Sequence, residues 1–515
     1  MILIVVYHKN NRISTVVSAT NKTLSFNKKW TVANGMVQLA TAFPQAKIVW
    51  CNTHCQENLN LKSIEVLFHH NKMMLSYCPD DNSYLGSKIG YVEESPFIKV
   101  NKKVSYPTWQ MSSAVGVIHA AVLLEIKDKI KTDCDFDYYL NSVAKIGMPL
   151  GLLCYSEPKL LNHTAIFEGQ KASVFTLFRF VKQHYKTRWI LLLFLNLMIY
   201  ERSFPFTAFL TSLFYKNRNK LSIYLESINV QSFRRVVDQT TIDVIIPTIG
   251  RKTYLNDVLK DFSMQSLLPK KIIVVEQNPV AGSSSELDYI QKEKWPFHIK
   301  HIFTHQAGAC NARNLALNQV ESEWVFLADD DIRFSADFNQ KALNNITKLG
   351  AKAVSISCLR KEERQTFKII FQWASFGSGC SIVHSESLKK CTFKSGYEFG
   401  YGEDADFGMQ LRNHGNDIVY LPKPEIVHLK APMGGFRTKP VLKWHDDKIQ
   451  PKPSPTVMLY ILIHNTKQQL LGYKTTLFFK YYKHQKIKNP YKYYKNFQKQ
   501  WDQSTFLAIN LQKRT

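Results

Sequence analysis

The sequence has few of the residues that mark several common protein classes. Glycine and proline number 21 and 19 among 515 residues, too few for a collagen-like or low-complexity chain. The nine cysteines are odd in number and scattered through apolar segments, which fits a disulfide scaffold poorly and favours a reducing, cytoplasmic compartment. Cys51, His54 and Cys55 have no second Cys/His pair at a useful spacing, so we expect buried thiols there and no zinc site.

Long apolar runs are also missing. Residues 189–200 and 204–215 are apolar runs of 12 residues each, short of the roughly 20 that cross a bilayer. Glu201 and Arg202 stand between them. For the linker 159–240 we expect a helical hairpin, buried or at a membrane interface, with a re-entrant or spanning segment and an ordinary core helix as alternatives. The N-terminal run MILIVVY lacks the basic region and cleavage site of a signal peptide and predicts a first β-strand.

Acidic residues are scarce relative to basic ones. The chain has 67 Lys and Arg against 41 Asp and Glu, a formal net charge of +26, which implies an anionic partner. The tail 436–515 mixes Lys with Tyr, Phe and Trp at helical spacings and predicts a basic, aromatic helical tail. Such a helix suits an anionic membrane surface. Packing on the rest of the protein and binding of single-stranded nucleic acid are the alternatives, and we do not expect nucleic acid as the partner.

What is present is two α/β blocks. Residues 1–158 alternate short apolar runs with helical stretches. Residues 241–435 contain the runs IDVIIP, KIIVVEQ, HIFTH and EWVFLA, separated by helical stretches, which predicts a mostly parallel sheet with both faces covered. Ligands bind such sheets beyond the carboxyl ends of the strands. The polar residues that follow each strand are therefore the candidates for a site.

Three adjacent carboxylates, Asp329, Asp330 and Asp331, follow the run EWVFLA. They repel one another unless a cation neutralises them. Alternate residues of an extended segment point the same way, so Asp329 and Asp331 are expected to face one site and Asp330 to face away. Hard oxygen ligands suit Mg²⁺ or Mn²⁺, which in turn holds a diphosphate. The alternative is a solvated acidic turn.

A second acidic group lies in the segment GYGEDADFGMQLRNHG. Glu403 and Asp404 stand where a helix is expected to begin, and Phe407 and Leu411 give that helix a buried stripe. A carboxylate at a helix N-terminus is stabilised as the anion and can accept a proton from a hydroxyl. Simple N-capping by Asp404 is the alternative, and both can hold at once.

The succession IDVIIPTIGR, IIVVEQ, GACNARNLAL, VFLADDDI, FGYGEDADFGMQLR and IVHL resembles the family 2 glycosyltransferases of GT-A fold, a Rossmann-like α/β fold. The resemblance implies that Asp331 touches the metal with Asp329 nearer the ribose, and that His428 completes the metal or diphosphate site. It implies Asp404 as general base, with Glu403 beside it binding acceptor hydroxyls. It places the nucleotide-sugar contacts at Pro247, Thr248, Arg251, Glu276, Asn311, Arg313, Asp329 and Asp330.

The N-terminal block is predicted to be a diverged α/β domain and can be aligned with the second block. CDFDYYLNSVAKIG laid against GEDADFGMQLRNHG brings Asp135 and Asp137 near the positions of Asp404 and Asp406. The run Asp80-Asp81-Asn82 then stands as an echo of the three aspartates. A degenerate structural or acceptor-binding copy, a second active transferase and coincidence remain as alternatives.

The function expected is a metal-dependent, inverting glycosyltransferase of surface polysaccharide synthesis, peripheral at the inner face of the cytoplasmic membrane. GYGEDADF is similar to a segment of galactosyl- and N-acetylgalactosaminyltransferases, which favours a UDP-hexose or UDP-N-acetylhexosamine donor. The acceptor expected is a glycan or lipid-linked glycan. The rivals are a catalytically idle glycan- or lipid-binding scaffold of the same fold, a sugar nucleotidyltransferase, and a nucleic-acid-binding protein.

Overall fold

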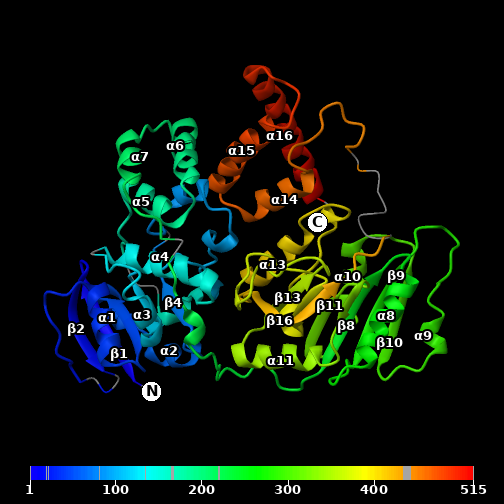
Figure 1. The fold of residues 1–515 in the computed structure, drawn as a ribbon, viewed down its shortest axis with the longest axis horizontal. Coiled ribbons are helices and arrows are strands. Elements are labelled where there is room, and N and C mark those ends of the chain that lie inside the picture. The colour runs from blue at the N-terminus through cyan, green and yellow to red at the C-terminus, as the bar shows by residue number, and fades with distance from the viewer. Residues whose placement is uncertain are drawn as a thin grey trace. The chain divides into compact units, whose positions relative to one another are not determined.

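The computed structural model describes residues 2–513 except 19, 21, 81, 134, 164–166, 219–220, 433–441 and 443. The chain forms two compact units, Met1–Arg234 with Asn465–His484, and Arg235–His464 with Gln485–Thr515 (Figure 1). From the sequence we expect domain boundaries at residues 158, 240 and 435. In the structure the linker belongs almost entirely to the first unit, and the tail is shared between the two.

The first unit is built on a seven-stranded sheet with the order β2-β1-β3-β6-β4-β7-β5. Its strands are β1 (Leu3–Lys9), β2 (Arg12–Ser18), β3 (Lys47–Asn52), β4 (Met73–Tyr77), β5 (Tyr106–Pro107), β6 (Val115–His119) and β7 (Leu153–Ser156). Its first helices are α1 (Val32–Ala42), α2 (Leu61–Leu67), α3 (Ala120–Ile126) and α4 (Phe136–Gly147). Ile4 and Val6 belong to the core under α1, α3 and α4, whereas Leu3 and Val5 belong to the core with α2. Both faces of the sheet are therefore covered, which explains the continuous apolar runs.

Four further helices complete the first unit: α5 (Val174–His184), α6 (Arg188–Glu201), α7 (Phe206–Ser212) and α15 (Lys467–Tyr482). The expected helical hairpin is formed by α6 and α7, which pack on each other and on α5. The buried Asn196 of α6 accepts a hydrogen bond from the Thr475 hydroxyl of α15 at 2.6 Å. Within the part of the chain that the structure describes, no helix combines the length and apolarity needed to cross a membrane.

A buried histidine makes the stability of the first unit depend on pH. His8 lies near the end of β1 with its Nε2 2.8 Å from the Ser113 carbonyl, and burial lowers the pKa of His8 to about 4. Below pH 6.5 His8 is protonated in the unfolded chain, whereas in the folded chain it stays neutral down to about pH 4. The stability of the folded state therefore falls as the pH falls from 6.5 to about 4. From pH 7.5 to pH 5 we expect a loss of about 2 kcal/mol from His8.

Hydrogen exchange of the β1 and β3 amides in the full chain checks this loss, because it follows the opening of this unit alone. A His8→Gln variant should lose that part of the pH dependence, and a variant at the exposed His54, His54→Gln, should keep it. An unchanged pH slope in His8→Gln would contradict the assignment.

The second unit is built on a nine-stranded sheet with the order β10-β9-β8-β11-β15-β13-β16-β12, with β14 paired to β16. Its strands are β8 (Ile242–Thr248), β9 (Lys271–Gln277), β10 (His298–Thr304), β11 (Trp324–Ala328), β12 (Ile332–Phe334), β13 (Ala353–Leu359), β14 (Phe371–Gln372), β15 (Cys380–His384) and β16 (Val419–His428). Its helices are α8 (Lys252–Ser263), α9 (Tyr289–Lys292), α10 (Ala309–Leu317), α11 (Phe338–Leu349), α12 (Ser385–Leu388), α13 (Glu403–Asn413), α14 (Pro455–His464) and α16 (Pro490–Gln512).

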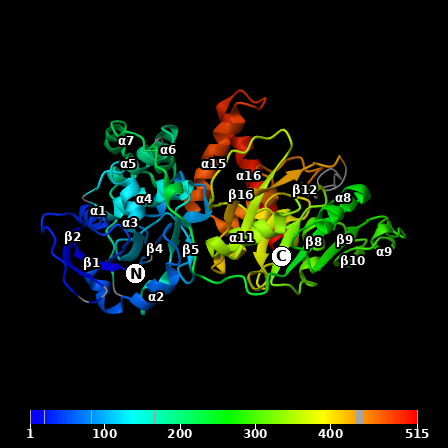
Figure 2. The same ribbon diagram turned by 60° about the horizontal axis from the view of Figure 1, so that its bottom comes forward.

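The expected α/β architecture is confirmed for this unit. Strands β10, β9, β8 and β11 are mutually parallel and separated along the chain by helices, and Figure 2 shows β8, β9 and β10 side by side with α8 and α9 next to them. Beyond β11 the sheet becomes mixed, because β15 runs antiparallel to both β11 and β13. The carboxyl ends of β8, β9 and β11 share one edge, so the residues after these strands can form one site.

Candidate active site

The three aspartates after β11 divide between two environments, as their alternation predicts. Asp330 is buried and faces the end of β8, where its carboxylate accepts from the Thr248 hydroxyl at 2.7 Å and from Arg251 at 2.5 Å. Asp329 and Asp331 instead lie together with His428. Burial raises the pKa of Asp330 to about 6, although Arg251 opposes the shift. Asp330 therefore ties the acidic turn to β8, and the other two carboxylates remain for a ligand.

Asp329, Asp331 and His428 each offer one ligand atom, and these atoms lie within 4.8 Å of one another. β12 and β16 pair Ile332 with His428, which places the imidazole Nε2 3.2 Å from an Asp331 oxygen. The backbone amide of Ala431 donates to the other Asp331 oxygen at 2.8 Å. Burial opposes ionisation of Asp331, but the hydrogen bonds from His428 and Ala431 outweigh it and hold the pKa of Asp331 below its usual value. Two carboxylates and an imidazole form a donor set that fits Mn²⁺ or Mg²⁺.

Arg313 and Gly379 fix the position of Asp329. The buried guanidinium of Arg313, on α10, lies 3.2 Å from an Asp329 oxygen. A Cβ at Gly379, just before β15, would lie 2.1 Å from the other Asp329 oxygen. Residue 379 must therefore be glycine for the carboxylate to keep this position.

Glu403 and Asp404 open α13, as the sequence predicts. Gly402 before them has φ +114°, a conformation that favours glycine. Burial raises the pKa of Asp404, with Arg313 opposing and Asp329 adding to the shift, and the Ser378 amide donates to its carboxylate at 3.3 Å. Burial and the adjacent Asp404 raise the pKa of Glu403 to about 7. Carboxylates with raised pKa values are suited to accept a proton near neutral pH.

A carboxylate that the sequence did not single out, Glu398, occupies the N-terminus of α10. Its two oxygens accept from the amides of Cys310 and Asn311, each at 3.0 Å. Gly308 makes this possible, because a Cβ there would lie 2.4 Å from the Glu398 carboxyl carbon. Asn311, one of the expected nucleotide-sugar contacts, thus has its backbone amide already paired, and its side chain donates to the Gln306 carbonyl at 3.2 Å. Glu398 lies close in sequence to the acidic motif at Glu403, and that closeness is the signal that could have identified it from the sequence.

The sequence also did not single out the role of Asp406. Its buried carboxylate lies 2.7 Å from His464 Nε2 and 3.3 Å from Lys394 Nζ, and it accepts from Gln410 at 2.7 Å. Burial opposes its ionisation, but His464 and Lys394 outweigh the effect and lower the pKa of Asp406. The pair of Asp406 and His464 links α13 to α14 and so fixes the helix that carries Asp404.

The remaining expected donor contacts lie at the ends of β8 and β9. Pro247 is half-buried at the end of β8, next to Thr248. Glu276 of β9 is buried and lies 2.9 Å from His301, and it accepts from the Ser285 hydroxyl at 2.5 Å. The structure therefore gathers Thr248, Arg251 and Arg313 around the aspartates, whereas the Glu276 carboxylate is engaged with the neighbouring loop and strand.

Comparisons with known proteins give partial matches. The chain is 37% identical to sorting nexin-3 of Candida albicans (strain SC5314 / ATCC MYA-2876) over 70 residues, 12% of this chain and 45% of that protein, so it spans less than half of that relative's length. It is similar to S. aureus TarS, with 20% identity, a TM-score of 0.32 and coverage of 37% of each chain. For TarS 1–349 in complex with UDP-GlcNAc the identity is 19% and the TM-score 0.36, with 45% of this chain and 70% of that chain covered.

A family match covers most of the sheet that carries the aspartates, up to but not including β16. Residues 243–394 match the model described as Glycosyl transferase family 2. The matched range runs from β8 past β15 and includes Asp329, Asp330, Asp331 and Arg313, and it ends before Glu403. The chain therefore contains a glycosyltransferase domain of family 2, with the GT-A fold of that family.

Proposed function

We propose that this chain transfers a sugar from a nucleotide-sugar donor to a hydroxyl of a glycan or lipid-linked glycan, with inversion and with the help of Mn²⁺ or Mg²⁺. The observation that carries the proposal is the cluster of Asp329 and Asp331, which follow β11, with His428 at the end of β16. The two aspartates lie inside the range of the family match, and His428 lies beyond it. A divalent ion held there would neutralise the charge of the leaving nucleoside diphosphate.

The chain's own residues supply the other parts of the reaction. Arg313 and Arg251 add positive charge next to the aspartates, where a diphosphate needs it. Asp404 lies close enough to Asp329 and Arg313 for their charges to act on its pKa, so an acceptor hydroxyl at this edge can give it a proton. Glu403 beside it can bind a second acceptor hydroxyl. The hydroxyl that Asp404 deprotonates attacks the anomeric carbon in line, the nucleoside diphosphate leaves from the opposite side, and the configuration inverts.

The proposed donor is a UDP-hexose or UDP-N-acetylhexosamine, because the GYGEDADF segment resembles that of transferases with such donors. The test is a donor screen with the full chain and Mn²⁺, following release of nucleoside diphosphate from UDP-, GDP- and dTDP-sugars. We expect release from one UDP-sugar, its loss when EDTA removes the metal, and its return when Mn²⁺ is added back. No release from any donor, together with no donor binding in calorimetry, would overturn the proposal in favour of the idle scaffold.

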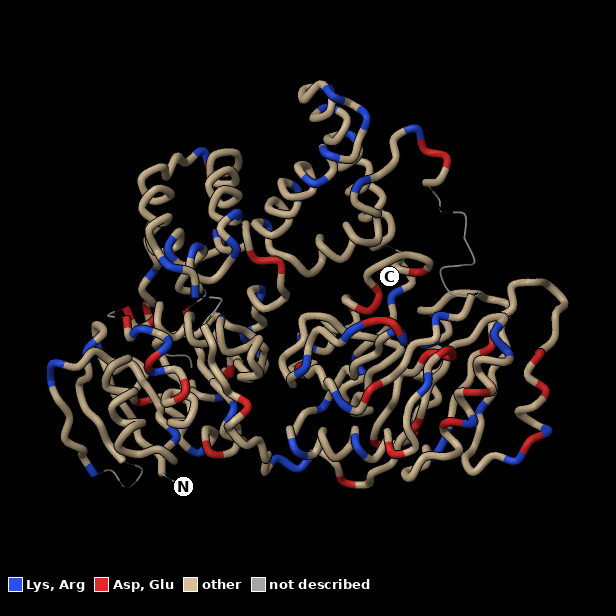
Figure 3. The backbone as a smooth tube through the Cα atoms, in the orientation of Figure 1, with Lys and Arg blue, Asp and Glu red and all other residues tan. Residues whose placement is uncertain are grey.

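We further propose that the protein acts at the cytoplasmic face of a membrane with an anionic surface, which would bring a lipid-linked acceptor within reach. Apolar side chains at the α6–α7 hairpin are exposed, and Phe214 just after α7 is 89% exposed. The charged residues of α15, which packs on α6, are all lysines, and Figure 3 shows blue positions along that helix. Exposed aromatic residues with lysines nearby suit an interfacial surface.

Replacing Phe204 and Phe214 by Asp should weaken binding of the full chain to vesicles of anionic phospholipid by at least about 100-fold, since each buried Phe contributes roughly 1.5–3 kcal/mol and two are removed. Vesicle co-sedimentation measures this. The control is Val66→Asp, an exposed apolar residue on α2, which should leave binding unchanged. The membrane proposal would be contradicted by an equal loss of vesicle binding in the Phe204/Phe214 variant and in Val66→Asp, or by no vesicle binding of the unaltered protein.

A further inference from the structure

The sheet of the first unit repeats the core of the sheet in the second. The pairs β1–β3, β3–β6, β6–β4 and β4–β7 run parallel, antiparallel, antiparallel and parallel, and so do β8–β11, β11–β15, β15–β13 and β13–β16. The short strands β5 and β14 each lie antiparallel to the last of these, β7 and β16. His119 and His384, at the ends of β6 and β15, each accept a backbone amide to cap the next helix. The first unit therefore has the topology of the glycosyltransferase core.

The strand registers show which residues correspond. The ladder between β3 and β6 ends with Cys51 opposite Val115, as the ladder between β11 and β15 ends with Ala328 opposite Cys380. The residues after Cys51, which are Asn52, Thr53 and His54, therefore stand where the three aspartates stand in the second unit. The expected echo of those aspartates at Asp80-Asp81-Asn82 does not hold, because β4 corresponds to β13; Asp81 itself lies outside the described residues.

The acidic residue of the base position is retained. Asp137, in the first turn of α4, accepts from the amide and the hydroxyl of Ser113, each at 2.7 Å. Ser378, just before β15, donates its amide to Asp404 in the first turn of α13. Asp137 therefore corresponds to Asp404, two residues away from the alignment expected from the sequence. Asp135 instead caps α4 by accepting the Tyr138 amide at 3.1 Å.

The parts that hold a nucleotide and a metal are replaced. Between β1 and β3 the described residues form β2 and α1, with no counterpart of β9 and β10. Asn52, Thr53 and His54 do not offer the paired carboxylates of a divalent-cation site, and the Asn52 side chain accepts the His54 amide at 3.0 Å. These replacements argue against a second active transferase. They do not affect the side of the fold around Asp137, which corresponds to the acceptor side of the second unit.

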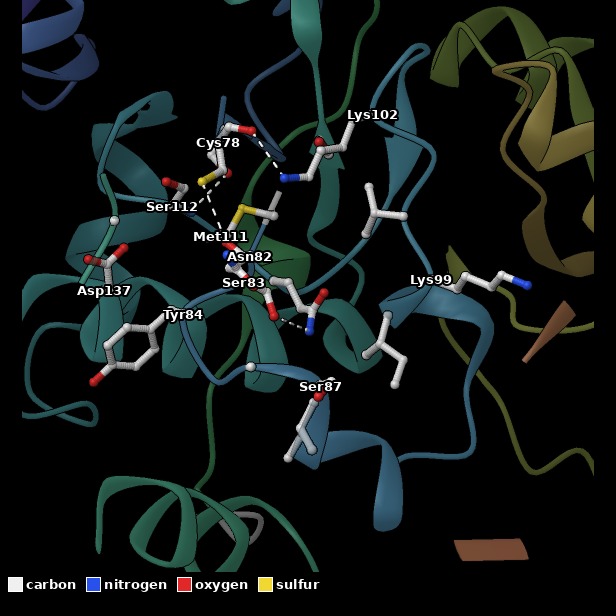
Figure 4. Close-up of a pocket in the computed structure, with 18 of the residues that line it drawn as sticks. Cys78, Asn82, Ser83, Tyr84, Ser87, Lys99, Lys102, Met111, Ser112 and Asp137 are labelled. Atoms are coloured by element: carbon white, nitrogen blue, oxygen red, sulfur yellow. Dashed lines mark hydrogen bonds between the residues drawn. The ribbon is translucent and has the colours of Figure 1, made fainter. Parts of the chain in front are cut away.

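A cavity of about 310 Å³ opens on that side of the first unit, and Asp137 is part of its wall. Five serines, one threonine and three side-chain amides line it, together with Tyr84 and Phe167. Figure 4 shows Asp137 and Tyr84 on one side and Lys99 and Lys102 on the other. The Lys102 ammonium donates to the backbone carbonyls of Cys78 and Asp80. The wall therefore combines neutral hydroxyls and amides with apolar side chains, among them Ile98, Val100 and Met111, and it holds one buried carboxylate, Asp137.

This chemistry selects a neutral, hydroxyl-rich ligand. A buried carboxylate repels phosphate but accepts from hydroxyls, and serine hydroxyls and amides both donate and accept. The aromatic rings of Tyr84 and Phe167 can pack on the apolar face of a sugar ring. Ligand cavities run from about 300 to 1,000 Å³, so this one suits about one sugar residue. We propose that the first unit is a non-catalytic saccharide-binding domain, derived from the transferase fold, that binds one sugar residue of a glycan in this cavity.

The proposal stands on the cavity and the repeat; only the identification of this glycan with the acceptor rests on the proposed function. The test is saturation-transfer NMR of the full chain with methyl glycosides of glucose, galactose, N-acetylglucosamine and N-acetylgalactosamine. We expect transfer to at least one glycoside with millimolar affinity. Asp137→Asn, which keeps the shape and can still accept the Ser113 amide, and Ser83→Phe, which fills the cavity, should each weaken it at least tenfold.

Two control variants separate this site from the transferase site. Asp128→Asn changes an exposed acid of the same unit and should leave glycoside binding intact. Asp404→Asn should also leave glycoside binding intact while it impairs enzymatic sugar transfer. Failure of the proposed function and failure of this inference are therefore distinguishable. The inference would be overturned if none of the four glycosides gave a saturation-transfer NMR signal. It would also be overturned if the signal were lost in Asp404→Asn but retained in Asp137→Asn and Ser83→Phe.

Discussion

An Asp331→Asn variant is expected to lose about 10³-fold in the rate of sugar transfer, because removing the negative charge weakens the metal that would stabilise the leaving diphosphate by several kcal/mol. Asp331 is the best-held member of the cluster, since His428 lies 3.2 Å from one of its oxygens and the Ala431 amide donates to the other. An asparagine retains the shape of the side chain. The effect should therefore appear in Mn²⁺ binding, measured by calorimetry, as well as in nucleoside diphosphate release.

The control for this variant is Asp288→Asn, which changes an exposed acid near Lys252 and Lys292 in the same unit and should leave transfer unchanged. His428→Ala tests the same site more mildly, since a ligand at the edge of the cluster can be replaced by water. We expect a higher Mn²⁺ requirement with partial recovery at saturating Mn²⁺. Full activity of Asp331→Asn in the presence of EDTA would show that the reaction needs no ion at this cluster.

Much of the second unit could be predicted because its strands are buried on both faces. VIIP, IIVV and WVFLA are continuous apolar runs, and the carboxylates that follow the third of them lie at the shared edge of the sheet. The alternation of Asp329, Asp330 and Asp331 follows from the pleat of an extended segment, so a local rule sufficed. The start of α13 at Glu403 likewise follows from the glycines before it and the apolar stripe after it.

Contacts between distant segments could not be predicted in this way. The pair of Asp406 and His464 joins residues 58 positions apart, and Glu398 reaches α10 from 87 positions away. No local pattern of the sequence specifies such pairings. The correspondence of the first unit also depends on strand register, because an alignment by helix and glycine alone placed Asp135 where the structure places Asp137. A shift of two residues leaves the helical pattern intact but moves the carboxylate out of the site.

An Asp404→Asn variant is expected to lower kcat by about 10²- to 10⁴-fold, the usual contribution of a general base. The change is nearly isosteric, and the asparagine oxygen can still accept the Ser378 amide, so thermal unfolding should be unchanged. Because Asp404 is outside the cluster of Asp329, Asp331 and His428, the affinity for Mn²⁺ and donor should also be retained. Loss of kcat with retained donor binding is the pattern that separates a base from a metal ligand.

The pH dependence of kcat gives a second readout for the same variant. Burial raises the pKa of Asp404, so acidification removes its basic form at a higher pH than it would for an exposed aspartate. The unaltered protein should therefore lose kcat as the pH falls, and the residual activity of Asp404→Asn should lack that acid limb. Glu403→Gln serves as the matched control, because a group that binds acceptor should raise KM more than it lowers kcat. The opposite result, a larger fall of kcat in Glu403→Gln than in Asp404→Asn, would move the base to Glu403, whose pKa burial and Asp404 raise to about 7.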